Sequence, residues 1–145
     1  MFFFALCSTA ALVNYYLQGG AKPSTVRSAD LYEVVNLQLA DFRGANFSGA
    51  YRHASSGIRQ RFNIDEFAAM IRSDYAGIVR AQRVEFGFVE TRGRHAIIQV
   101  FFIDATGQVT PCIYSLVSEG EGWKIDGAQV LRRWPAGARL SGIRS

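Results

Sequence analysis

The hydrophobic pattern of this chain changes its period near Arg80, and this change constrains the fold more than any other feature. Before Arg80, apolar residues recur at the spacing of one face of an α-helix. After it, apolar and polar residues alternate, as in a β-strand with one buried face. A chain that places helices first and strands second predicts an α+β domain, with helices packed on an antiparallel sheet.

Three amphipathic helices are expected in the first half of the chain. Ser28 is suited to cap the first helix, and Asn46 is suited to cap a second, shorter one. Asn63 and Glu66 have the spacing of a capping box, in which each residue bonds the backbone of the other, and so predict the start of a third helix. Gly77 is expected to end that third helix, because glycine commonly follows the last helical residue.

Four strands are expected in the second half, joined by short glycine-containing turns into a meander. In the first strand, the alternation places Val84, Phe86 and Phe88 on one side. The three later strands are expected over residues 96–103, 109–118 and 123–131.

The second of these strands, residues 96–103, is apolar on both faces except for Gln99. Three helices cover only one face of a four-stranded sheet, so the other face of this strand needs a different cover. The pattern therefore predicts a homodimer that forms through the sheet.

Composition and charge indicate one folded domain over residues 28–131. The chain has 145 residues, of which 49% are hydrophobic, which suits one core and is too short for two. The net charge of +4 comes entirely from four arginines in a basic tail, residues 132–145. The remainder is neutral, so nucleic acid is not an expected partner of the folded part. These arginines are Arg132, Arg133, Arg139 and Arg144.

Residues 1–21 form an apolar leader without a charged residue, which indicates a signal peptide or a membrane anchor. No basic residue precedes the apolar run, whereas Lys22 and Arg27 follow it, and this order favours retention over secretion. The two alternatives stay open at this point. The expected location is membrane-anchored or exported to a periplasmic or other extracytoplasmic space, with membrane contact through the leader.

The last predicted turn and strand, beginning with residues 122–127, resemble the nuclear transport factor 2-like superfamily, also called cystatin-like. A closer resemblance is to an uncharacterised bacterial family of domains of unknown function within it. The resemblance implies three helices closing over a bent four-stranded sheet to form a cone, which the superfamily uses for catalysis, ligand carriage or dimerisation. The segments that carry the closer resemblance are residues 39–42, 50–51, 54–59 and 67–71, together with Tyr75.

An enzyme of this fold needs a carboxylate or histidine base inside the cone, facing a hydrogen-bond donor that stabilises developing negative charge. Three aspartates are candidates for the base, but their positions beside core residues or helix ends indicate surface roles. The histidines form no recognisable pair, so no catalytic residue is assigned. The candidates considered are Asp41, Asp74 and Asp126 as bases, and Tyr51, Tyr75, Tyr114 and His53 as donors, with His95 unassigned.

The two cysteines indicate neither a disulfide framework nor a metal site. Cys7 lies in the leader and Cys112 in a predicted strand, without a second cysteine or histidine at metal-binding spacing. Cys112 is therefore interpreted as a buried hydrophobic residue. No glycine-rich phosphate loop is present, and no metal or cofactor is expected.

The leading interpretation is a non-catalytic domain that dimerises or holds a small apolar ligand in the cone. One alternative is an isomerase, cyclase or dehydratase acting on a small hydrophobic substrate. Another is a membrane-surface or nucleic-acid contact through the arginine tail. The expected pocket walls are Tyr51, Phe67, Tyr75, Phe86, Tyr114 and Trp123.

Overall fold

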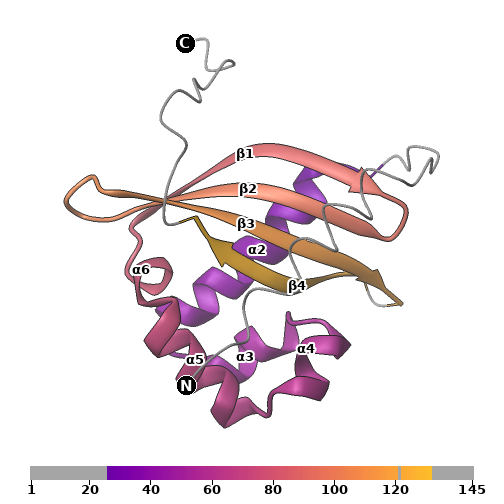
Figure 1. The fold of residues 1–145 in the computed structure, drawn as a ribbon, viewed down its shortest axis with the longest axis horizontal. Coiled ribbons are helices and arrows are strands. Elements are labelled where there is room, and N and C mark those ends of the chain that lie inside the picture. Colours follow the sequence, from indigo (N-terminus) through magenta and orange to yellow (C-terminus); the bar gives the residue numbers. More distant parts are fainter. Residues whose placement is uncertain (1–25, 121, 132–145) are drawn as a thin grey trace.

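A computed structural model of the protein describes residues 26–120 and 122–131 and shows an α+β fold (Figure 1). Within this part of the chain, five helices precede four strands, which confirms the predicted fold class. The helices are α2 (Ser28–Arg43), α3 (Phe47–Arg52), α4 (Ser56–Arg61), α5 (Ile64–Asp74) and α6 (Ala76–Val79). The strands are β1 (Arg83–Arg92), β2 (His95–Ile103), β3 (Val109–Glu119) and β4 (Gly122–Val130).

Two of the three predicted helix caps are confirmed. The Asn46 side chain accepts a hydrogen bond from the Gly49 amide at the start of α3. Asn63 and Glu66 form the expected capping box, with both bonds at 2.9 Å. The prediction for Ser28 is wrong, because Ser28 is already the first helical residue and the preceding Arg27 makes no side-chain cap bond.

The prediction that Gly77 ends the third helix is also wrong. Helix α5 ends at Asp74, and Gly77 lies inside the short helix α6. The break falls at Tyr75, whose φ of −120° leaves the helical region. The Tyr75 hydroxyl donates a 2.7 Å hydrogen bond to the Ala128 carbonyl, so a contact with β4 holds this residue in place.

The four strands form an antiparallel sheet in the order β1-β2-β3-β4, as the predicted meander requires. Helix α2 crosses one face of this sheet, α3, α4 and α5 lie beyond β4, and α6 lies next to α5 on the left of the molecule (Figure 1). The segment between α3 and α4 is tied to β4, because Ile125 exchanges backbone hydrogen bonds with His53 and Ser55. The helices and the sheet therefore form two layers.

Strand β1 departs from simple alternation at a bulge. Its register against β2 shifts between Phe86 and Val89. Phe88 is 52% exposed, whereas Val84, Phe86 and Val89 pack against the core. The prediction that Phe88 shares a face with Val84 and Phe86 is therefore wrong, because the extra residue of the bulge moves Val89 into the core-facing row.

The core lies between α2 and the inner faces of β2 and β3. Leu31 and Val35 of α2 are fully buried, and so are Ile98 and Val100 of β2. Core-facing residues alternate along β2, with Ala96 and Phe102 completing the row.

The predicted leader, residues 1–21, and the predicted basic tail, residues 132–145, lie outside the described residues. Among the helices of the described part, none has the length and hydrophobicity needed to cross a membrane.

Candidate functional site

The outer face of the sheet, which we define as the face of β2 and β3 turned away from the helices, is apolar at its centre. On β2, Ile97 and Ile103 alternate with the buried core residues. On β3, Pro111, Ile113, Ser115 and Val117 alternate in the same way with Cys112, Tyr114 and Leu116. The face predicted from the doubly apolar strand is therefore mainly apolar over two adjacent strands, with Gln99 and Ser115 as polar members.

Gln99 lies in the middle of this outer face and is only 7% exposed. It pairs with Ile113 across the ladder to β3. On its other side is the bulge of β1, where a Cβ on Gly87 would lie 2.5 Å from the Gln99 Oε1 atom and 3.1 Å from the Phe101 ring. The missing side chain at Gly87 thus lets Gln99 and Phe101 lie against β1.

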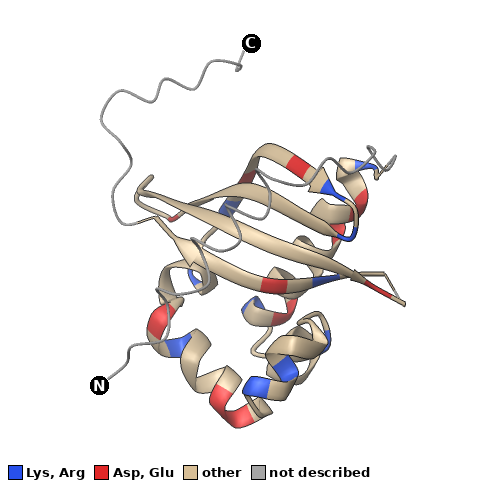
Figure 2. Ribbon diagram, turned by 45° about the vertical axis from the view of Figure 1, so that its right-hand side comes forward, with Lys and Arg blue, Asp and Glu red and all other residues tan. Residues whose placement is uncertain are grey.

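Charged residues occur on the two edge strands and not at the centre of the outer face (Figure 2). Strand β1 carries two exposed ion pairs, Arg83 with Glu85 at 3.1 Å and Arg92 with Glu90 at 3.0 Å. On the opposite edge, Lys124 of β4 pairs with Val117 in the ladder. An apolar centre with a charged rim is typical of protein interfaces.

The six predicted pocket residues do not gather around one space. Phe67 is 3% exposed and packs edge-on against Tyr51 at 5.4 Å, while Tyr114 is 1% exposed beside Phe102. Phe86 and Trp123 lie on β1 and β4, the two opposite edges of the sheet. These side chains contribute to the core cluster or pack against it.

Hydrogen bonds and ring contacts engage several of these candidates. The Tyr51 hydroxyl donates to the carbonyls of Arg59 and Phe62, at 3.1 and 2.7 Å, and the Phe86 ring stacks on Tyr32 at 4.2 Å. Burial raises the pKa of the Tyr75 hydroxyl and, further, that of Tyr114. A role of the six in ligand binding stays a prediction.

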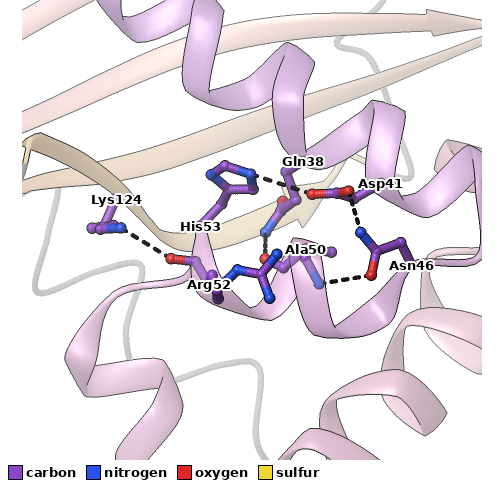
Figure 3. A network of polar contacts seen from close by, with 8 residues as sticks. Gln38, Asp41, Asn46, Ala50, Arg52, His53 and Lys124 are labelled. Carbon is purple, nitrogen blue, oxygen red and sulfur yellow. Dashed lines mark hydrogen bonds and ion pairs between the residues drawn. The ribbon is translucent and has the colours of Figure 1, made fainter.

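Asp41 and His53, two of the residues considered for catalysis, meet between α2 and the end of α3 (Figure 3). The His53 Nε2 atom lies 3.3 Å from one Asp41 oxygen, and the Asn46 amide donates a 2.7 Å hydrogen bond to the other. A Cβ on Gly49 would lie 2.6 Å from Asp41 Cγ, so glycine is needed where α3 passes this carboxylate. The sequence showed Asn46 as a cap, but contained no signal for the pair.

The surroundings of His53 on balance disfavour its charged form. Burial lowers the pKa of His53 below its ordinary value of 6.5. The Asp41 carboxylate opposes this effect, while the positive charges of Lys124 and Arg52 reinforce it. Lys124 is held nearby, because its ammonium donates a 3.0 Å hydrogen bond to the Arg52 carbonyl (Figure 3).

The other candidate aspartates serve local structure. Asp126 accepts a 2.6 Å hydrogen bond from the Ser55 hydroxyl, which itself caps α4. Asp74 is exposed at the end of α5 and accepts a bond from Ser73. Cys112 is fully buried, and burial raises the pKa of its thiol to about 12, as expected for a structural cysteine.

Two hollows open on the surface of the described residues, and none of the six predicted pocket residues lines either. One is bordered by α6 and the turn between β2 and β3, and the other by the starts of α3 and α5. Over residues 26–120 and 122–131, no group of three or more His, Cys, Asp or Glu residues is placed to hold a metal ion.

Comparison with solved structures supports the fold. A domain of unknown function with a cystatin-like fold from Nostoc punctiforme PCC 73102 matches with a TM-score of 0.53 and 15% sequence identity, over 77% of this chain and 80% of that one. A phospholipid-binding protein from Ralstonia solanacearum, solved with a phospholipid, matches with a TM-score of 0.45 and 16% identity, over 73% and 78%. A search of curated proteins found no match.

The sequence also matches a family model over residues 24–138, which includes every described helix and strand. The resemblance to an uncharacterised family of domains of unknown function is thereby confirmed, and the solved structure from Nostoc punctiforme agrees with a cystatin-like fold. The chain belongs to the family described as Domain of unknown function DUF4864.

Proposed function

We propose that this protein is a non-catalytic interaction module that pairs with a second copy of itself through the outer face of its sheet. The observation that carries the proposal is the mainly apolar surface formed by alternate residues of β2 and β3. In the described part of the chain, helix α2 packs on the opposite face of the sheet (Figure 1). Burying the outer face would remove apolar area from water.

The charges around the surface suit a second copy. A two-fold interface brings the same surface of both molecules together, so each rim must complement itself. The rim on β1 carries Arg83 and Arg92 together with Glu85 and Glu90, and therefore offers both signs of charge. A partner that carries charge of a single sign would be repelled by either the arginines or the glutamates of this rim.

The size of the sheet requires the edge strands to take part in the dimer. Strand β2 has nine residues. At about 3.3 Å per residue and about 4.8 Å between strands, β2 and β3 alone present roughly 290 Å², and all four strands present roughly 570 Å². Two copies therefore reach the lower limit of about 1,000 Å² for a specific interface only when the rims on β1 and β4 are also buried.

The interior of the cone favours an interaction module over a carrier of a small apolar ligand. Phe67, Tyr114 and Phe102 are almost completely buried within the core cluster. A carrier needs a concave space lined by such side chains. The burial of Phe67 and Tyr114, two of the residues predicted to line a pocket, supports this preference.

The test is native mass spectrometry and sedimentation velocity on the full chain in a mild detergent, comparing wild type with Ile113→Lys. The charged side chain in the middle of the outer face should convert a dimer into a monomer. Leu37→Lys is the matched control, because Leu37 is an apolar residue of α2 that is 47% exposed. This control should remain a dimer.

The same measurements separate the alternatives. A wild-type monomer, or equal effects of the two lysine variants, would contradict pairing through this face. A bound small molecule that stays with the protein under gentle ionisation would favour the carrier. Asp41→Asn and His53→Gln should leave association unchanged, because neither residue lies on the outer face.

A further inference from the structure

A hollow of about 390 Å³ lies away from the outer face, between α6 and the turn that joins β2 to β3. In Figure 1 both elements lie on the left of the molecule. Gly77 and Arg80 border the hollow from the side of α6, and Asp104, Thr106 and Gln108 border it from the turn. Its size is at the lower end of the range for pockets that bind small molecules.

The turn holds an acidic group in a defined position. One oxygen of Asp104, Oδ1, accepts hydrogen bonds from the Thr106 amide at 2.8 Å, the Thr106 hydroxyl at 2.6 Å and the Gln108 amide at 3.0 Å. The bonds from Thr106 keep the pKa of the Asp104 carboxyl below its ordinary value. Among the described residues no donor reaches the second oxygen, so a negative charge remains available to a ligand.

A positive group lies near this carboxylate without neutralising it. Arg80 follows α6 and is exposed, and it forms no ion pair within the described residues. Its charge is close enough to Asp104 to influence the carboxyl electrostatically. The hollow therefore presents two opposite charges that do not contact each other.

Beside these charges, the hollow is lined by the small residue Gly77 and the polar residue Thr110. An added Cβ on Gly77 would lie 3.9 Å from the Thr110 oxygen, at ordinary contact distance. The nearly buried Phe102 lines the same space.

We propose that this hollow binds a small zwitterion, such as an α-amino acid, whose carboxylate pairs with Arg80 and whose ammonium group pairs with Asp104. A ligand with both charges satisfies both groups at once, and charge-assisted hydrogen bonds are stronger than neutral ones. A simple anion would be repelled by Asp104, and a simple cation by Arg80. The proposal does not depend on self-association, because the hollow and the outer face use different residues.

The experiment is a titration of the full chain followed by amide NMR, with L-alanine, L-leucine and L-glutamine as probes. Propionate and propylamine serve as controls that each carry only one of the two charges. At least one amino acid should shift the amide signals of Gly77, Thr106 and Gln108 in a saturable manner. Propionate and propylamine should bind at least about tenfold more weakly.

Two variants remove one charge each. Asp104→Asn retains the Oδ1 acceptor that orders the turn, and Arg80→Gln shortens an exposed side chain. Each should weaken amino-acid binding about tenfold, which is the loss expected for one charge-assisted hydrogen bond. Arg83→Gln is the control, because it removes an exposed arginine that does not line the hollow, and it should bind like wild type.

Three results would overturn the proposal. One is that none of the three amino acids produces saturable shifts at concentrations up to about 10 mM. A dissociation constant above this concentration would be too weak for a specific small-molecule site. Another is equal binding of propionate and the amino acids, which would indicate a site for anions in general. The third is binding that Arg80→Gln and Asp104→Asn leave intact.

Discussion

The Asp41–His53 pair shows how a polar contact arises between residues that are twelve positions apart in the chain. Helix α2 supplies the carboxylate, and the cap residue of α3, Asn46, fixes it with a 2.7 Å hydrogen bond. His53 ends α3, and its carbonyl accepts a hydrogen bond from the Ile125 amide of β4. The histidine therefore connects both helices to the sheet.

This environment predicts a dependence of stability on pH. Because burial lowers the pKa of His53 below 6.5, the unfolded chain binds a proton at a higher pH than the folded protein does. The free energy of unfolding should therefore fall as the pH drops below about 6.5. The slope should remain under the limit of about 1.4 kcal/mol per pH unit for one proton, since solvent screens this half-buried side chain.

Urea denaturation at several pH values between about 7 and 5 would measure this slope. His53→Gln should flatten it, because glutamine does not titrate. Asp41→Asn removes the charge that favours protonation, so its stability should keep falling to a lower pH than that of wild type. An equal slope in wild type and His53→Gln would show that His53 does not cause the effect.

At the scale of single elements, the sequence predicted a helix cap correctly where a side-chain oxygen accepts a hydrogen bond from an amide of the first turn. The side chains of Asn46 and Asn63 both accept such a bond. Ser28 has the right residue type but lies one position too far into the helix. Type and spacing predict a cap only when the residue immediately precedes the first helical residue, as Asn46 and Asn63 do.

This difference gives a direct test. Asn63→Ala removes the side-chain half of the capping box of α5 and should lower the free energy of unfolding by about 1 kcal/mol. Ser28→Ala removes no cap bond and should change it by less than about 0.5 kcal/mol. Urea titration of both variants compares them on one scale, and an equal loss would contradict the assigned caps.

The bulge of β1 illustrates what an element pattern misses. Val84, Phe86 and Phe88 alternate in the sequence, but Gly87 allows Gln99 to approach closely and the register shifts there. A bulge depends on the neighbouring strand as much as on its own residues. For this reason, alternation alone assigned Phe88 to the wrong face.

At the scale of the whole molecule, helices and strands that are far apart in sequence form one closed core. The core joins Leu31 of α2, Ile78 of α6 and Leu116 of β3, each at most 2% exposed. Cys112 lies in the same cluster. Access of reagents to this thiol thus depends on opening of the fold.

We expect Cys112 to resist alkylation until the protein unfolds globally. Its thiol is buried and has a pKa of about 12, so both access and thiolate formation are suppressed. Labelling with iodoacetamide at increasing urea, followed by mass analysis of the Cys112 peptide separately from Cys7, should track the unfolding curve. Labelling in buffer at the rate of an unprotected thiol would contradict this account.

By itself, the sequence determined the order of helices and strands, two of the caps, the meander and the apolar outer face, because local periodicity and turn residues encode these features. It also carried the resemblance that the family match confirmed. Tertiary structure decided the rest: the break at Tyr75, the bulge at Gly87 and the contact of Asp41 with His53. It also decided that Phe67 and Tyr114 lie in the core. The packing of segments that are distant in sequence determines which aromatic side chains fill the core and which could line a cavity.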